Sequence, residues 1–172
     1  MKKAILVLAL LFFVSSSINA QFQEGKNFAG PAIGLSFLGN TVSFGANFEH
    51  AMKMADIPGL IGIGGLVRYW SYGELYYNYT DIIIAAQGNY HIALANKKLD
   101  PYIGLILGYD INSWKYDGPY SEYLTSTTGG GVIFGLSLGG RYWFSPSMAV
   151  NARFGTGSNL GSTLDLGLDF KF

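Results

Sequence analysis

The chain has few of the side chains on which catalytic and metal sites depend. It contains no cysteine and only two histidines in 172 residues. The lack of cysteine excludes disulfide bonds, thiol chemistry and a lipid-modified cysteine anchor. Charged residues make up only 13% of the chain, and no basic patch indicates a nucleic-acid partner. We therefore expect no cofactor and no metal site built on histidine and cysteine.

Long apolar runs are also scarce. The one at the start, residues 4–14, follows Lys2 and Lys3 and precedes small polar residues up to Ala20. It is shorter than the roughly 20 apolar residues of a spanning helix, and this three-part order is typical of a cleavable signal peptide. We predict a signal peptide over residues 1–20 and one domain over residues 21–172. Loss of the two lysines leaves nine basic and eleven acidic residues, a net charge near −2.

In the rest of the sequence, apolar residues alternate with small or polar residues over many segments. In LDLGLDFKF (164–172), leucine and phenylalanine occupy every second position, and Asp, Gly and Lys fill the gaps. This period of two places alternate side chains on opposite faces of a β-strand. Eight such segments occur, around residues 31–37, 42–48, 61–69, 82–92, 103–111, 132–142, 148–154 and 164–172.

The second face of these segments carries most of the glycines and all of the charge within them. The charged residues on it are Glu49, Arg68, Asp110, Arg141, Arg153, Asp165, Asp169 and Lys171. A soluble exterior would carry many more charges than this face does. The apolar face carries none, as expected in lipid, where a charge near the midplane costs about 2–4 kcal/mol. Because backbone groups in lipid must all be paired, the sheet must close. The sequence thus predicts an all-β fold, an eight-stranded antiparallel transmembrane β-barrel with charges inside.

The connections fix the expected orientation. With both ends in the periplasm, the external connections are 39–41, 71–81, 112–128 and 156–160, and the periplasmic ones are 52–58, 95–100 and 144–147. Long external loops and short periplasmic turns are typical of outer-membrane barrels. The longest connection, 112–128, contains Trp114, Tyr116, Tyr120 and Tyr123. These rings are candidate contacts for an extracellular ligand, although packing within the loop explains them more simply.

Three stretches carry a resemblance to a known family: LDPYIGLILGYD (99–110), GLSLGGRYWFSPSMAVNARFGTG (135–157) and LDLGLDFKF (164–172). Through them the chain resembles the small outer-membrane beta-barrel domain family, similar in size to OmpA/OmpX-like eight-stranded barrels of Gram-negative bacteria. The resemblance covers roughly residues 22–172 and implies a place in the outer membrane. It also implies that Leu168, Phe170 and Phe172 form the signal read by the barrel-insertion machinery. Members often carry Glu in the seventh strand where this chain has Arg153, so a role tied to that acid does not transfer.

The inward charges have two interpretations. By strand direction Arg68, Asp110, Arg153 and Asp165 fall in the outer half, and Glu49, Arg141, Asp169 and Lys171 in the inner half, with His91 near Glu49. Each layer mixes signs, which favours ion pairs that satisfy one another and plug the lumen. The alternative is a pore whose gate is a salt bridge that changes partner.

Catalysis finds little support in the sequence. A nucleophile needs a base within hydrogen-bond reach, and His50 and His91 both fall toward the periplasmic end, away from the serines of the outer loops. Four acids fall in the external connections: Glu74, Asp81, Asp117 and Glu122. They could bind a divalent cation or act on a peptide, but carboxylates scattered over two loops are usually solvated charge.

The sequence therefore predicts a non-catalytic outer-membrane barrel with a structural or adhesive role. Its tyrosine-rich loops would contact an extracellular ligand, and its other partners would be outer-membrane lipid and the insertion machinery. We expect a monomer. The alternatives are a small-solute pore gated by interior ion pairs and a lipid-modifying enzyme.

Overall fold

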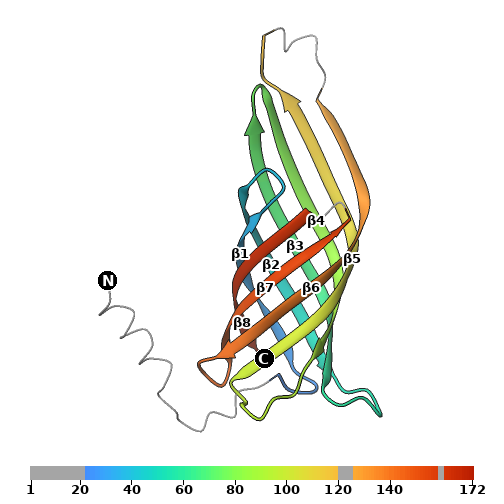
Figure 1. Ribbon diagram of the computed structural model, residues 1–172, viewed down its shortest axis with the longest axis vertical. Helices are drawn as coiled ribbons and strands as arrows, with labels where there is room; N and C mark the ends of the chain where they lie inside the picture. Colours follow the sequence, from blue (N-terminus) through green and yellow to red (C-terminus); the bar gives the residue numbers. More distant parts are fainter. Residues whose placement is uncertain (1–21, 120–125, 159–160) are drawn as a thin grey trace, which may run out of the picture.

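A computed structural model describes residues 22–119, 126–158 and 161–172, and in it eight antiparallel strands form one closed barrel (Figure 1). Each strand is hydrogen-bonded to the next in sequence, and β1 closes on β8. The predicted fold class is confirmed. The strands are β1 (Asn27–Ser36), β2 (Thr41–Met52), β3 (Leu60–Glu74), β4 (Tyr77–His91), β5 (Leu99–Tyr116), β6 (Thr127–Trp143), β7 (Met148–Ser158) and β8 (Gly161–Lys171). The predicted signal peptide, residues 1–20, lies outside the described residues.

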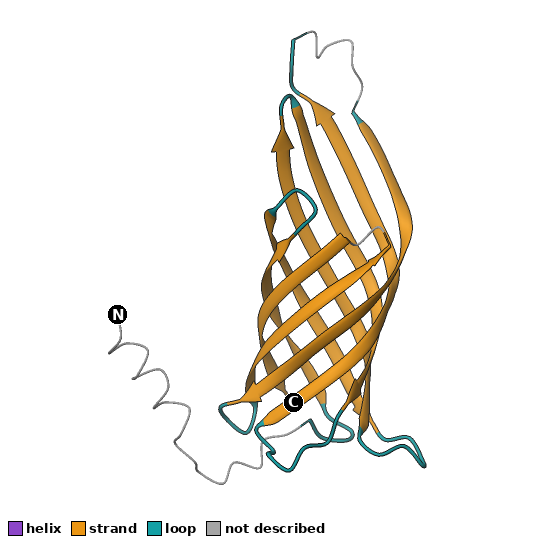
Figure 2. Ribbon diagram, in the orientation of Figure 1, coloured by secondary structure: helices purple, strands orange, loops and turns teal. Residues whose placement is uncertain are grey.

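Strands and their connections account for the described part of the chain (Figure 2). Within those residues there is no helix long and apolar enough to cross a membrane.

Exposure alternates along each strand as the sequence predicts. Side chains such as Ile33, Phe44 and Leu136 point outward and are about half exposed, at 52%, 54% and 51%. Their neighbours Gly34, Ser43 and Ser137 face inward and are buried. An exterior of exposed leucine, isoleucine and phenylalanine suits the hydrocarbon of a bilayer.

The interior also contains apolar side chains, which the sequence analysis did not anticipate. One cluster fills the middle and outer part of the lumen: Leu66, Trp70, Ile83, Ala85, Ile106 and Ile133. A second lies at the inner end: Phe22, Phe28, Ala51, Trp143 and Ala149. The lumen is therefore packed by rings and branched side chains as well as by charge.

The barrel wall is much taller on one side, where β3, β4, β5 and β6 extend past the other strands (Figure 1). The pairing of β2 with β3 begins at Ser43 and Trp70, and the pairing of β6 with β7 ends at Phe134 and Ser158. Residues 71–74 and 127–133 thus belong to strands that stand above their neighbours. We assign this tall end to the outside, because outer-membrane barrels have long external segments.

Three predicted external loops are shorter in the structure, and one of them is 156–160, because β7 runs to Ser158. The expected connection 71–81 reduces to Leu75 and Tyr76, and the expected connection 112–128 shrinks because β5 runs to Tyr116 and β6 starts at Thr127. The alternating rings of residues 77–79 and 114–116 are good strand formers. The sequence does not predict a strand here, because neither face of these stretches is apolar. The connections around 52–58 and 144–147 agree with the structure to within a residue.

Candidate functional site

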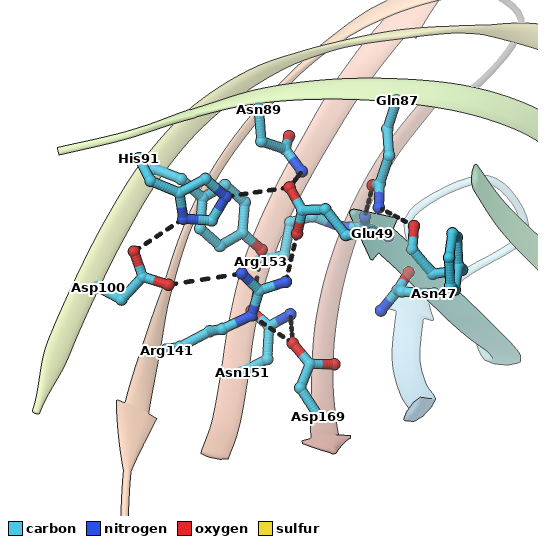
Figure 3. A network of polar contacts seen from close by, with 12 residues as sticks. Asn47, Glu49, Gln87, Asn89, His91, Asp100, Arg141, Asn151, Arg153 and Asp169 are labelled. Atoms are coloured by element: carbon cyan, nitrogen blue, oxygen red, sulfur yellow. Dashed lines mark hydrogen bonds and ion pairs between the residues drawn. The ribbon is translucent and has the colours of Figure 1, made fainter. Parts of the chain in front are cut away.

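Arg141 of β6 is the centre of a buried cluster in the inner half of the lumen (Figure 3). Its guanidinium donates to Asp169 Oδ2 at 2.5 Å, to Asp100 Oδ2 at 3.4 Å and to Glu49 Oε2. The three acids come from β8, β5 and β2, so the arginine ties together strands on different sides of the barrel. Asn151 adds a hydrogen bond of 3.0 Å to Asp169 Oδ2. A planar guanidinium with five donors is suited to several acceptors at once.

His91 of β4 completes this inner cluster. Its Nδ1 lies 2.7 Å from Asp100 Oδ1 and its Nε2 lies 3.0 Å from Glu49 Oε1. Glu49 Oε1 also accepts a hydrogen bond of 2.9 Å from Asn89 Nδ2. Both ring nitrogens face carboxylate oxygens, and only the doubly protonated ring donates to both. The inner cluster therefore places the Arg141 guanidinium and the His91 ring between three carboxylates.

A ring from the segment before β1 covers the inner cluster. Phe22 is only 3% exposed, and its ring lies parallel to the imidazole of His91. It also stacks on Phe28, with 4.5 Å between ring centroids, and Arg141 Cζ lies 5.2 Å from its centroid. Cation–π and ring contacts of this kind favour a fixed position for the arginine. Phe22 therefore packs into the inner end of the lumen against both the inner cluster and the apolar cluster.

A second cluster lies further toward the outside and is built on one carboxylate. Asp165 Oδ2 accepts Arg68 Nη2 and Arg153 Nη2, both at 2.9 Å. Arg68 Nη2 also donates to Asn47 Oδ1 at 2.8 Å, and Arg153 Nη1 donates to Gln87 Oε1 at 2.9 Å. Two guanidinium groups thus share one acid, and neutral amides take up further donors.

The structure brings six of the eight predicted network residues into these two clusters: Glu49, Arg141 and Asp169 in one, and Arg68, Arg153 and Asp165 in the other. Asp110 faces the interior but forms no ion pair among the described residues; its Oδ2 accepts Asn112 Nδ2 at 3.3 Å. Lys171 lies half-exposed at the inner end. Its Nζ contacts Gln23 Oε1 at 3.2 Å and the Trp143 ring at 5.3 Å rather than a carboxylate. Side-chain parity predicts that both face the lumen, but it does not predict the partner of either residue.

Asp100 is an interior residue that the sequence analysis missed. The sequence analysis predicts a connection over 95–100, which includes this residue. The structure begins β5 at Leu99, and Asp100 then shares the inward face with Tyr102. The alternation of Asp100, Tyr102 and Gly104 continues the parity of β5 and was the available signal.

A cavity of about 420 Å³ opens at the outer end of the lumen, and we call it the outer vestibule. Asp81 and Asp110 lie in its lining, although they are only 5% and 3% exposed. Tyr72, Tyr79 and Trp114 line it as well. The rings of Tyr72 and Tyr79 are stacked, with 4.9 Å between centroids. The outer vestibule therefore combines two buried acids with three large rings.

The candidate loop contacts fall in different places. Trp114 faces the outer vestibule, and Tyr116 packs near the tip, 5.1 Å from Tyr77 between ring centroids. Both belong to β5 rather than to a loop. Tyr120 and Tyr123 lie outside the described residues.

The four external acids do not form a cluster in the described part of the chain. Asp81 is buried in β4, whereas Asp117 is exposed beyond the end of β5. Asp117 pairs with Lys115 at 2.7 Å and accepts Asn78 Nδ2 at 2.6 Å. These hydrogen bonds lower the pKa of the Asp117 carboxyl. Glu74 is exposed at the end of β3, and Glu122 lies outside the described residues. The described residues hold no group of three metal-binding side chains.

The proposed assembly residues lie on the outer face near the inner end of β8. Leu168, Phe170 and Phe172 are 40%, 41% and 61% exposed. The backbone of Phe172 exchanges two hydrogen bonds of 2.9 Å with Asn27 at the closing seam. The side chain of Phe172 is not needed for this contact.

Neither histidine sits in a catalytic arrangement within the described residues. His50 Nδ1 lies 2.8 Å from Asn27 Oδ1 at the inner end, and His91 lies between two carboxylates. No serine is hydrogen-bonded to either ring in the part of the chain that the structure describes.

Comparison with solved structures places the fold among eight-stranded outer-membrane barrels. The N-terminal β-barrel domain of OprF from Pseudomonas aeruginosa is 14% identical, with a TM-score of 0.61 over 87% of this chain and 98% of that one. OprG from the same organism is 11% identical, with a TM-score of 0.60 over 91% and 99%. Ail, the attachment invasion locus protein of Yersinia pestis, is 14% identical, with a TM-score of 0.53 over 87% and 100%. No protein-family model matches the chain, and no curated protein sequence matches it. The resemblance to OmpA/OmpX-like barrels is thus confirmed at the level of the fold, in keeping with a place in a Gram-negative outer membrane.

Proposed function

We propose that the chain is a non-catalytic outer-membrane protein that binds other surfaces through the protruding sheet of β3–β6. The observation that carries the proposal is the one-sided extension of these four strands above the barrel (Figure 1). A rigid sheet above the membrane holds its residues in fixed positions, as a contact surface requires.

The tip of the sheet offers rings for such a contact. Tyr76 is 56% exposed, and its ring packs at 6.1 Å and 69° against that of Tyr116. Tyr77 is 37% exposed beside them. Exposed tyrosines are enriched where proteins bind one another, because they combine an apolar ring with a polar tip.

The sides of the sheet offer backbone groups. Residues 72–74 of β3 and 127–131 of β6 lie beyond the last pairs that these strands form with β2 and β7. Open strand edges of this kind accept an extended segment from a partner by backbone pairing. The glycines at 129–131 leave the β6 edge without side chains that would block such pairing.

An adhesion assay tests the proposal. Cells of a laboratory Gram-negative strain that display the protein would be applied to surfaces coated with fibronectin, laminin or mucin, and to sister cells. We expect adhesion that falls when Tyr76, Tyr77 and Tyr116 are all changed to serine. The matched control is Met54→Ser with Ile57→Ser, which removes exposed apolar side chains at the other end of the barrel. Surface-exposed protein that adheres to none of these surfaces would contradict the proposal.

The pore alternative is tested separately by single-channel conductance in planar bilayers. The two ion-pair clusters and the apolar clusters fill the lumen, so we expect no steady openings from the native chain or from Arg153→Ala. Openings that change with Arg153→Ala would instead favour a gated pore. A shift in gel mobility on heating shows in each case that the barrel is folded.

A further inference from the structure

The acids of the outer vestibule stand apart from both ion-pair clusters. Asp81 of β4 pairs in register with Asn112 of β5, and Asp110 lies two residues from Asn112 on the same inward face. Diagonal neighbours of this kind are about 7–8 Å apart between Cα atoms. Asp81 Oδ2 and Asp110 Oδ1 are buried and have no hydrogen-bond partner among the described residues. A buried carboxylate oxygen without a partner is costly and calls for an explanation.

No cation of the described chain compensates this pair. Arg68 lies in the same row of the sheet as Asp110, but Ile83 lies between them in the register. The guanidinium of Arg68 is committed to Asp165 and Asn47 instead. On the other side, Gly131 stands opposite Asp110 in β6 and contributes no side chain. Two neighbouring carboxylates disfavour each other's charged form unless a positive group stands between them. A positive group can reach Asp81 and Asp110 from the open, outer side, where the cavity that they line opens.

The walls above the acids are aromatic. Tyr72 and Tyr79 form a stacked pair, and Trp114 packs edge-on against Tyr77, with 5.7 Å between ring centroids. Ring faces attract cations, with tryptophan the strongest, and rings with carboxylates are the usual surroundings of an organic ammonium group. The cavity of about 420 Å³ lies in the size range of small-molecule sites, about 300–1,000 Å³.

We propose that the outer vestibule binds an organic cation, a protonated amine or a guanidinium group. Asp81 and Asp110 pair with its charge, and Tyr79 and Trp114 pack against its carbon or planar part. A dehydrated metal ion fits less well, because the described residues supply no third ligand of the histidine, aspartate or glutamate type. The inference goes beyond the proposed function, because it concerns the outer vestibule and not the tip of the sheet. It holds whether or not the tip binds another surface.

Two sources carry this chemistry: a free small amine, and a lysine or arginine side chain of a bound polypeptide. Both present the same charged head to the acids. They differ in the group attached to that head, a short carbon chain in one case and a polypeptide backbone in the other, so a panel of probes separates them.

Isothermal titration calorimetry on the chain without its signal peptide, refolded in an uncharged detergent, tests the proposal. The probes are 1,4-diaminobutane, guanidinium chloride, a pentapeptide with a central lysine, and calcium chloride. We expect binding of at least one of the first three, and stronger binding of the diamine or of the peptide identifies the source. Asp81→Asn and Asp110→Asn should each weaken binding about tenfold, the scale of one charge-assisted hydrogen bond. Trp114→Leu should weaken it about threefold through loss of the ring face.

The matched control is Asp117→Asn, which removes an acid of the same end that is exposed and lies outside the outer vestibule. This variant should bind as the native chain does. Folded native protein that binds none of the three organic probes would overturn the proposal. So would binding of calcium alone, unaffected by Trp114→Leu, or organic binding that is equally weakened by Asp117→Asn.

Discussion

The ring of Phe22 lies flat on the imidazole of His91, with 3.6 Å between ring centroids and 9° between planes. Phe22 precedes β1, so a residue outside the strands takes part in the interior of the barrel. Through His91 it contacts the cluster of Arg141, and through Phe28 it contacts the apolar cluster at the inner end. Residues 22–26, which the structure describes before β1, are therefore part of the fold.

Phe22→Ala should lower the free energy of unfolding by about 3–5 kcal/mol, since it empties a buried aromatic site. Urea unfolding in lipid vesicles, followed by tryptophan fluorescence, measures the change. Glu24→Ala is the control, because Glu24 is exposed in the same segment. Equal midpoints for Phe22→Ala and the native chain would show that the ring contributes nothing to the barrel.

Arg141→Met should cost about 3–5 kcal/mol, because it leaves Glu49, Asp100 and Asp169 without their shared cation. Arg141→Lys keeps the charge but loses the planar guanidinium, so its stability should lie between that of the native chain and that of Arg141→Met. The same unfolding assay applies. Lys171→Met, which removes a half-exposed cation without a carboxylate partner among the described residues, should change stability by less than about 0.5 kcal/mol. A stable Arg141→Met barrel would mean that the acids find another counter-charge.

Arg68 and Arg153 should behave as a coupled pair, because both donate to the same oxygen of Asp165. Arg68→Met or Arg153→Met alone leaves one guanidinium on that acid. The double variant leaves none, so its loss of stability should exceed the sum of the two single losses by about 0.5–3 kcal/mol. A double-mutant cycle on unfolding free energies measures this excess. Strict additivity would indicate that the two arginines act independently.

The eight strands were predictable because lipid and lumen impose opposite demands. Leu164, Asp165 and Leu166 follow one another in β8, and the charge alone decides which face points inward. The height of the strands was not predictable in this way. In the part of β4 above the membrane, at Tyr77, Asn78 and Tyr79, neither face of the strand contacts lipid. The apolar alternation that indicates a strand in the sequence is therefore lost there.

The sequence predicts which charged residues face the interior, but not which of them form ion pairs with one another. Arg68 meets Asp165 across 97 positions in the chain, and Arg141 meets Glu49 across 92. These partners lie on strands that are not neighbours in the sheet, so their contact depends on the stagger of the closed barrel and not on local pattern. Phe22 carries no periodic signal at all, and only the folded barrel shows where its ring goes.

Gly64 and Gly88 offer a matched pair of substitutions in the sheet. A Cβ at Gly64 would lie 1.9 Å from the main-chain oxygen of Phe48, whereas one at Gly88 would meet nothing within 4 Å. A backbone oxygen in a strand cannot swing aside as a side chain can. Gly64→Ala should therefore destabilise the barrel by about 1–3 kcal/mol, and Gly88→Ala should leave it unchanged or stabilise it by about 0.4–1 kcal/mol. Urea midpoints that rank the two variants in the opposite order would contradict the role of close strand approach at Gly64.

Phe172→Ser separates assembly in the cell from stability of the barrel. The side chain of Phe172 is 61% exposed on the outer face, and its contribution to the seam is made by the backbone, through two hydrogen bonds with Asn27. The purified variant should therefore refold in detergent with the native yield and heat-shifted mobility. If the ring is read by the insertion machinery, the same variant should accumulate less in the outer membrane of living cells, as measured by fractionation and immunoblot. Leu105→Ala, another exposed apolar residue far from that end, serves as the control and should reach the membrane normally. Equal membrane levels for Phe172→Ser and the native chain would assign the ring to lipid contact alone.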